Sequence, residues 1–132
     1  MEKVKGIGGI FFKGDKRDEL MKWYTDNLGI EAEWTSEGSA GKAFLWKDRA
    51  APHADGSTIW SLFPRDTKYF TPGRASFMVN YRVDDLDKML EQLRDSGAEV
   101  DDRIEESEFG KFGWVVDPEG NRIELWEPPA GM

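Results

Sequence analysis

The stretch from Gly113 to Trp126 constrains the fold more than any other part of this sequence. Both of its arms are rich in β-branched, apolar and aromatic residues, which suit a pleated and half-buried surface. Between the arms, Asp117 can accept hydrogen bonds from the backbone that follows it, Pro118 fixes φ, and Gly120 tolerates positive φ. The sequence therefore predicts two short strands joined by a tight turn.

The second arm of this hairpin carries a carboxylate on a face that is otherwise built for burial. Alternation along a strand puts Arg122, Glu124 and Trp126 on one face, and Ile123 and Leu125 on the other. A charge on a buried face needs a partner, a ligand or solvent. Glu124 is therefore a candidate binding residue, and a simple pair with Arg122 on the same face explains it equally well.

The predicted elements follow the order strand, helix and three strands, and this order occurs twice. We expect strands at 4–12, 30–34, 41–47, 57–63, 75–83, 100–105, 112–116 and 122–126. We expect one helix after an Asp15 cap, ending at Gly29, and a second after Asp84 or Asp85, ending at Gly97. One domain, 1–132, would then contain modules at about 3–63 and 75–127, with a linker at 64–74.

Three motifs in this order resemble the vicinal oxygen chelate superfamily, which includes glyoxalase I, bleomycin-resistance proteins and extradiol dioxygenases. They are the runs from Trp23 to Gly29, from Tyr81 to Asp87 and from Asp117 to Leu125. The resemblance covers nearly the whole chain and is specific for the fold, whereas this fold hosts many reactions. It implies an α+β fold in which two βαβββ modules with curled mixed sheets form a cup around the site. It also implies a homodimer.

Glyoxalase-type members hold a divalent metal with one side chain from each of four strands. Transferred through the resemblance, these positions fall on Gly9, Trp60, Met78 and Glu124. Only Glu124 is of a ligand type that suits Zn, Ni, Fe or Mn, and the neighbours of the other three positions offer no strong ligand. One carboxylate does not hold a divalent ion in a closed site. We therefore expect neither a metal cofactor nor the metal-dependent catalysis of the family.

An aromatic binding cup is the expected alternative to a metal site, because Trp and Met replace ligands. The candidate ligand-binding residues are Phe11, Trp60, Met78, Asn80, Trp114 (or Phe112), Glu124 and Trp126, with contributions from Trp34 and Trp46. Such a surface holds flat molecules by stacking and cations by cation–π contacts. Each aromatic residue taken singly is better explained as core, whereas the set with a carboxylate favours a pocket.

The leading hypothesis is a metal-independent protein of the bleomycin-resistance type, which sequesters a small aromatic or cationic molecule. Antibiotic resistance is the role that the resemblance implies. The alternative is a glyoxalase- or dioxygenase-like metalloenzyme with a displaced site built from His53, Glu105 or Glu106. A third hypothesis is a non-catalytic scaffold whose cup is packed solid. His53 itself is typical of a solvated loop residue.

Composition excludes several other classes of function. The net charge of −8 opposes nucleic-acid binding and would favour cationic ligands by long-range attraction. On composition alone, solubility is the better explanation of this charge. The chain contains no cysteine, so it can form no disulfide or thiolate site. No apolar run approaches the roughly 20 residues of a membrane span, and the first residues lead directly into a predicted strand without a secretory signal. We expect a cytoplasmic protein.

Overall fold

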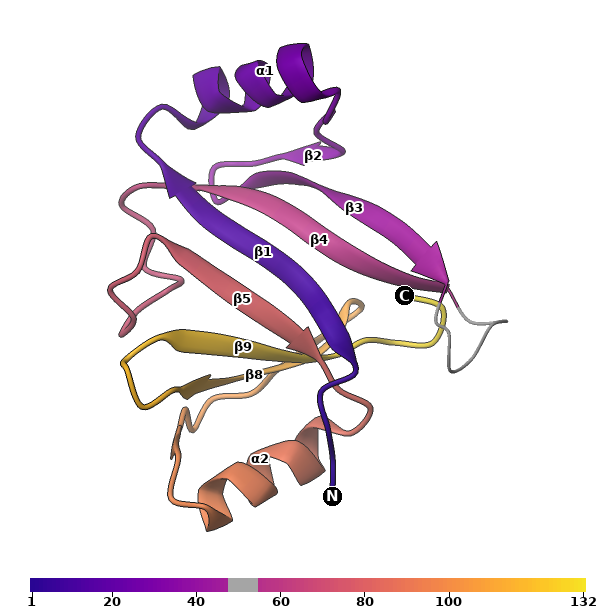
Figure 1. The fold of residues 1–132 in the computed structure, drawn as a ribbon, viewed down its shortest axis with the longest axis vertical. Helices are drawn as coiled ribbons and strands as arrows, with labels where there is room; N and C mark the ends of the chain where they lie inside the picture. Colours follow the sequence, from indigo (N-terminus) through magenta and orange to yellow (C-terminus); the bar gives the residue numbers. More distant parts are fainter. Residues whose placement is uncertain (48–54) are drawn as a thin grey trace.

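One sheet runs through both halves of the chain (Figure 1). The computed structural model describes residues 1–47 and 55–132. In chain order the elements are β1 (Gly6–Gly14), α1 (Arg17–Leu28), β2 (Trp34–Thr35), β3 (Ala40–Lys47), β4 (Asp55–Pro64), β5 (Phe77–Arg82), α2 (Leu86–Asp95), β6 (Glu99–Val100), β7 (Glu105–Ser107), β8 (Gly110–Val116) and β9 (Arg122–Glu127). Across the sheet the order is β2-β3-β4-β1-β5-β9-β8-β6, and β7 pairs with β8.

The two halves of the sheet have matching topologies. In the first half β1 runs parallel to β4, and in the second β5 runs parallel to β9. The antiparallel pair of β1 and β5 joins the halves, so a single chain supplies both sides of the sheet. Figure 1 shows α1 and α2 at opposite ends of this curved sheet. The expected α+β fold with a curled mixed sheet is confirmed.

Both helices cover the same face of the sheet. Leu86, Met89 and Leu90 of α2 are buried against a cluster that includes Val115 and Leu125. On α1, Met21 packs in a second cluster with Leu62 of β4, and Trp60 lies against this cluster. The opposite face, which carries Glu124, is therefore left free of helices. Neither described helix is long and apolar enough to cross a membrane.

The caps of the two helices differ from each other. The Asp85 side chain accepts a hydrogen bond from the backbone nitrogen of Lys88 at 3.0 Å, which confirms the expected cap of α2. The expected Asp15 cap of α1 is wrong, because Asp15 instead accepts a hydrogen bond from the Arg65 side chain at 2.9 Å. The helix end at Gly29 is confirmed by its left-handed φ of 70°.

Two expected strands differ most from the structure. Of the segment expected at 30–34, only Trp34 belongs to a strand, β2, which continues to Thr35 and pairs with β3. The strand expected at 100–105 is split into β6 and β7, because Asp101 turns the chain by accepting a hydrogen bond from the backbone nitrogen of Arg103 at 2.9 Å. The sequence also predicts a surface loop at 50–56, which contains His53. Residues 50–54 of it lie outside the described residues, and Asp55 and Gly56 belong to β4.

The closing hairpin has the expected form. β8 and β9 are antiparallel, with Trp114 opposite Glu124. In the turn, Asp117 accepts hydrogen bonds from the backbone nitrogens of Glu119 and Asn121 and from the Asn121 side chain, each at 2.9 Å. These bonds to the charged form hold the pKa of Asp117 below its ordinary value.

The Asp85 cap gives a testable prediction about stability. Replacing Asp85 with Ala leaves the backbone nitrogen of Lys88 without its partner, and should lower the free energy of unfolding by about 1 kcal/mol. The neighbouring Asp84 is a matched control, because its exposed side chain makes a surface ion pair with Lys5 at 3.5 Å and caps no helix. Asp84→Ala should cost less than about 0.5 kcal/mol in the same urea titrations. Equal losses in both variants would contradict the cap.

Candidate functional site

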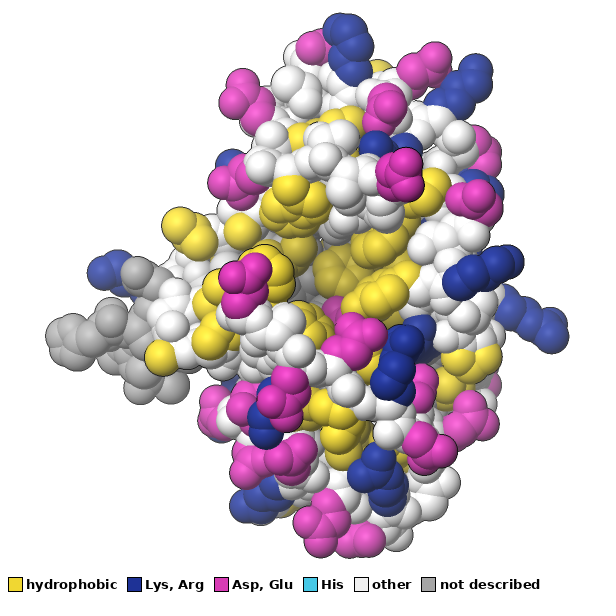
Figure 2. Space-filling model, turned by 180° about the vertical axis from the view of Figure 1, so that it is seen from behind, with side chains coloured by type: hydrophobic (Ala, Val, Ile, Leu, Met, Phe, Trp, Pro, Cys, Tyr) yellow, Lys and Arg dark blue, Asp and Glu magenta, His cyan; other side chains and the backbone are white. Residues whose placement is uncertain are grey.

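A cavity of about 380 Å³ opens on the face of the sheet that the helices leave free. Figure 2 shows this hollow, in which hydrophobic side chains gather at the centre of the molecule. Its wall is mainly aromatic, and the aromatic lining residues are Phe11, Trp34, Phe63, Tyr69, Phe109, Phe112 and Trp126. The volume falls within the range of about 300–1,000 Å³ that is typical of small-molecule sites.

Polar side chains lie among these aromatic rings. Ser61, Asn80 and Glu124 line the cavity and are buried, with 3%, 1% and 1% of their surfaces exposed. Asn80 and Glu124 stand side by side because β5 and β9 are parallel and pair these two residues directly. The Asn80 side chain also needs a glycine beneath it, since a Cβ at Gly8 would overlap its Oδ1 atom.

Three donors hold the Glu124 carboxylate. Asn80 Nδ2 donates to Oε2 at 2.6 Å, and Trp114 Nε1 donates to Oε1 at 3.1 Å. The Tyr69 hydroxyl also donates to Oε1. A carboxylate that leaves water needs such partners, because an unpaired buried charge costs on the order of several kcal/mol. The donors come from β5, β8 and the segment between β4 and β5, so they bring distant parts of the chain together.

Burial dominates the titration of this network. Loss of water raises the pKa of Glu124, although the hydrogen bonds from Tyr69, Asn80 and Trp114 act in the opposite direction. Burial and the nearby Glu124 charge raise the pKa of the Tyr69 hydroxyl, which therefore stays protonated and able to donate. Burial also lowers the pKa of Arg122.

Arg122 stands beside this network and pairs with a different acid. Its Nη2 lies 3.7 Å from Asp101 Oδ2, and its Nη1 donates to the backbone oxygen of Tyr69. Its guanidinium group lies over the rings of Trp114 and Tyr69, at 4.9 and 5.8 Å. The hairpin face predicted for Arg122, Glu124 and Trp126 is correct, and the ion pair of Arg122 in this structure is with Asp101.

Trp126 is held from both sides. Its ring stacks on Phe112, with the centroids 6.0 Å apart and the planes inclined by 7°. The guanidinium group of Arg82 lies 5.0 Å from the Trp126 ring and 5.2 Å from the Trp46 ring. Trp126 Nε1 also donates to the backbone oxygen of Phe109 at 2.7 Å. Several contacts therefore hold this wall of the cavity in place, and Trp46 contributes to it through Arg82.

The structure brings most of the expected binding residues together. Phe11, Asn80, Glu124 and Trp126 line the cavity. Met78 and Trp114, each 1% exposed, pack with Phe11 in the buried cluster beneath it.

Trp60 is the exception, and its expected place in the cup is wrong. It points to the opposite face, where its ring meets Phe12 and Tyr24 at 5.7 and 4.9 Å. The β4 residues that line the cavity are Ile59, Ser61 and Phe63 instead. The transferred position was off by one residue, and in a strand such a shift changes the face.

Several cavity residues were not expected from the sequence. Tyr69 lies in the segment expected to be a linker, which has no periodic pattern. Phe63 ends a predicted strand, and Phe109 lies in the short turn between β7 and β8. The adjacent aromatic pair Tyr69 and Phe70 was the available signal, since two large rings in a polar segment seldom remain in solvent.

The residues present do not fit the divalent metal that the family resemblance implies. On the strands beside Glu124, Gly9 offers no side chain, and Ile59, which pairs with Gly9 on β4, is apolar. Asn80, the partner of Gly9 on β5, turns its amide nitrogen rather than its oxygen toward the carboxylate. Both carboxylate oxygens already accept hydrogen bonds from protein donors. In the described part of the chain, no three His, Cys, Asp or Glu side chains gather as a metal site.

The displaced metal site gains no support from its described members. Glu105 pairs with Arg103 at 3.6 Å, and Glu106 pairs with Lys111 at 3.9 Å. Both acids are exposed on β7. The third candidate, His53, lies outside the described residues.

The buried carboxylate gives a prediction about pH. Because burial raises the folded pKa of Glu124 above its ordinary value of 4.5, the folded state binds more protons than the unfolded state. The protonated Glu124 therefore contributes to the free energy of unfolding. This contribution is complete below pH 4.5 and is lost as the pH rises through the raised pKa of the folded state. Glu124→Gln removes the titrating group and places an amide nitrogen where one donor needs an oxygen. The substitution should lower the free energy of unfolding by about 1–3 kcal/mol at low pH and by less at high pH.

Urea denaturation at a series of pH values tests this sign. The stability difference between wild type and Glu124→Gln should shrink as the pH rises, while the exposed Glu91→Gln control should stay within about 0.5 kcal/mol of wild type at neutral pH. A difference that grows with rising pH would contradict the account.

Comparison with known proteins supports the fold. A family model described as a glyoxalase-like domain matches residues 9–126. No curated protein matches the chain. Among solved structures, a variant of methylmalonyl-CoA epimerase from Streptomyces coelicolor, in complex with 2-nitronate-propionyl-CoA, is 18% identical with a TM-score of 0.67, over 93% of this chain and 96% of that chain.

Two further structures are similar. Methylmalonyl-CoA epimerase from Mycobacterium tuberculosis is 20% identical with a TM-score of 0.62, over 96% of this chain and 89% of that one. The Mn(II)-bound glyoxalase from Novosphingobium aromaticivorans is 15% identical with a TM-score of 0.69, over 99% of this chain and 42% of that one. At these identities the likeness shows the fold alone. Because the family model spans nearly the whole chain, the protein belongs to the glyoxalase-like domain family of the vicinal oxygen chelate superfamily.

Proposed function

We propose that this protein binds a small planar aromatic molecule in its cup without a metal, in the manner of the sequestering bleomycin-resistance proteins. The observation that carries the proposal is the cavity of about 380 Å³ with an aromatic wall and a buried carboxylate in its lining. Flat ligands gain by stacking on such walls, and the cavity excludes water from the contact. A cup packed solid, as the scaffold hypothesis requires, does not agree with this volume.

The polar lining favours a ligand that donates hydrogen bonds or carries positive charge. An ionised Glu124 only accepts hydrogen bonds, and Asn80 Oδ1 has no hydrogen-bond partner among the described residues. No Lys or Arg of the described chain lines the cavity. An aromatic amine can donate hydrogen bonds to this lining, and a planar cation brings the positive charge that the lining lacks. The net charge of −8 would also attract a cation from a distance.

A homodimer, which the family resemblance implies, is not needed to complete this site. The described lining comes from strands and connections of both halves of one chain. We propose dimerisation only as the family's usual assembly, and the binding experiment below does not depend on it.

Two fluorescent probes test the proposed binding. N-phenyl-1-naphthylamine is a neutral aromatic amine with one N–H donor, and proflavine is a planar cation. Both should bind wild type saturably at one site per chain, and tighter binding of proflavine would favour a cationic natural ligand. Failure of both probes to bind would contradict the proposal.

A matched pair of phenylalanine variants locates the binding. Phe109 and Phe77 are similarly exposed, at 54% and 52%, but only Phe109 lines the cavity. Phe109→Ala should weaken probe binding by about five-fold or more, since a truncated aromatic contact typically costs about 1 kcal/mol. Phe77→Ala should leave the dissociation constant within about two-fold of wild type. Equal effects of the two substitutions would place the probe outside the cup.

A further inference from the structure

One wall of the cavity belongs to the outermost strand of the sheet. Trp34 and Ser39, which both line the cavity, lie on either side of the turn that joins β2 to β3. β2 ends the sheet order, and its described ladder with β3 joins Trp34 to Gly41 and Thr35 to Ala40. Just before β2, the Glu33 backbone nitrogen donates to the Gly41 backbone oxygen at 2.8 Å, and the Glu33 side chain accepts from the Ala43 backbone nitrogen at 2.7 Å. As the edge strand, β2 is nevertheless paired on one side of the sheet alone, unlike the central strands.

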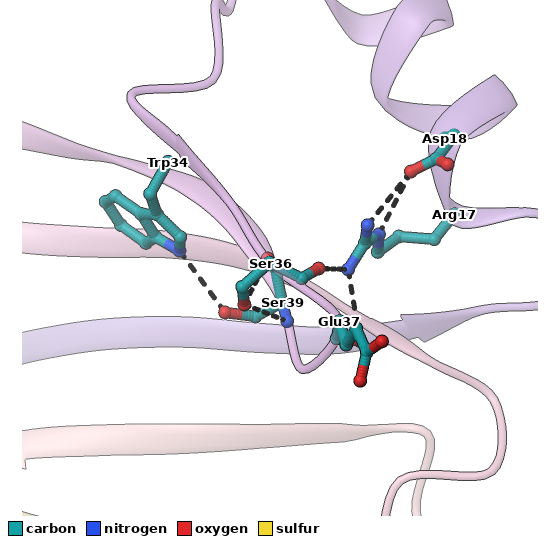
Figure 3. Close-up of polar contacts among 6 residues, drawn as sticks. All are labelled: Arg17, Asp18, Trp34, Ser36, Glu37 and Ser39. Atoms are coloured by element: carbon teal, nitrogen blue, oxygen red, sulfur yellow. Dashed lines mark hydrogen bonds and ion pairs between the residues drawn. The ribbon is translucent and has the colours of Figure 1, made fainter.

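Internal hydrogen bonds make the turn and the Trp34 ring one unit (Figure 3). Trp34 Nε1 donates to Ser39 Oγ at 3.2 Å, and the backbone nitrogen of Ser39 donates to Ser36 Oγ at 3.2 Å. The backbone nitrogen of Ser36 donates to the backbone oxygen of Ser39 at 2.9 Å. A displacement of the turn would therefore carry the Trp34 ring with it.

The Arg17 side chain fastens this unit to the helix. Arg17, the first residue of α1, donates through Nη1 to the backbone oxygens of Ser36 and Glu37, the latter at 3.3 Å. On its other side, Nε and Nη2 of Arg17 donate to Asp18 Oδ1 at 3.3 and 3.0 Å, so the guanidinium group lies between helix and turn (Figure 3). Only 13% of the Arg17 side chain is exposed, which separates this contact from an ordinary surface ion pair.

We propose that Arg17 is a positioning residue, which sets how far the Trp34–Ser39 wall reaches over the cavity and so selects ligands by size. Arg17 does not line the cavity, so it acts through the turn. Helix α1 is itself anchored to the sheet through Met21 and Leu62, which gives the turn a fixed reference. This inference rests on the proposed binding function, since size selection has meaning only for a cavity that takes a ligand.

Two variants on the same helix separate the fastening from a general loss of charge. Arg17→Ala removes the donors to the turn, whereas Lys22→Ala removes an exposed ion pair with Asp26, made at 2.5 Å, that lies away from it. Arg17→Lys keeps the charge and loses the fork, so it should give an intermediate result and serves if the alanine variant does not fold. Circular dichroism would establish that each variant is folded.

The first readout needs no ligand. In protein labelled with ¹⁵N at tryptophan, the indole N–H resonance of Trp34 should shift and broaden in Arg17→Ala, and should keep its position in Lys22→Ala. An unchanged Trp34 resonance in Arg17→Ala would overturn the proposal, because the turn would then hold its place without Arg17.

The second readout is selection by size, measured with 1-naphthylamine and N-phenyl-1-naphthylamine, which differ by one phenyl ring. The ratio of their dissociation constants should change by about 2- to 30-fold in Arg17→Ala, the range found for residues that act on a site without touching its ligand. In Lys22→Ala the ratio should match wild type. An unchanged ratio in Arg17→Ala would overturn this inference alone, whereas no binding to wild type would overturn the proposed function and this inference with it.

Discussion

The site depends on one buried carboxylate and the three groups that donate to it. Glu124 is 1% exposed on β9, and its donors are Tyr69, Asn80 and Trp114. Because β5 and β8 flank β9 in the sheet, two of these bonds tie neighbouring strands together across their faces. The third fixes the connection between the two halves of the chain. Both oxygens of the Glu124 carboxylate have protein donors, and a buried network of this kind favours one arrangement of its members over others.

The same network decides what chemistry the cup can perform. The family resemblance places Glu124 at a position that holds a metal ligand in glyoxalase-type members. In this protein the oxygens of Glu124 instead accept hydrogen bonds from an amide, an indole and a phenol. Arg122 lies over two of these donor residues and adds a positive charge close to the carboxylate. A divalent ion would have to displace the donors and tolerate that charge. These contacts support the proposal that the cavity binds an organic ligand that stacks on its rings.

Sequence reasoning succeeded where a local pattern determines the geometry. The alternation of Arg122, Glu124 and Trp126, the turn at Asp117 and the cap at Asp85 all follow from neighbouring residues, and the structure confirms them. The fold followed from motifs whose order is specific. The prediction for Trp60 was wrong because the sequence predicts no tight turn next to β4 that would fix which of its side chains point into the cup. The face of each β4 residue depends on the register of the strand in the sheet, and a shift of one residue puts every side chain on the other face.

Long-range partners explain the remaining differences. Asp15 accepts a hydrogen bond from Arg65 instead of capping α1, and Tyr69 donates to Glu124, which lies 55 positions further along the chain. Nothing in the sequence next to either residue indicates its partner. Arg17 is a similar case, since its contact with the turn at Ser36 depends on how α1 rests on the sheet. Contacts of this kind form only once the sheet is assembled, so a pattern within a short window cannot reveal them.

The most direct test of the central claim is a titration of chelator-treated protein with Mn(II), in which the free ion is followed by electron paramagnetic resonance. We expect wild type and Glu124→Gln to take up Mn(II) equally weakly, because protein donors already occupy the carboxylate. Tight binding of one Mn(II) per chain in wild type, lost in Glu124→Gln, would show that Glu124 is a metal ligand and would contradict the account.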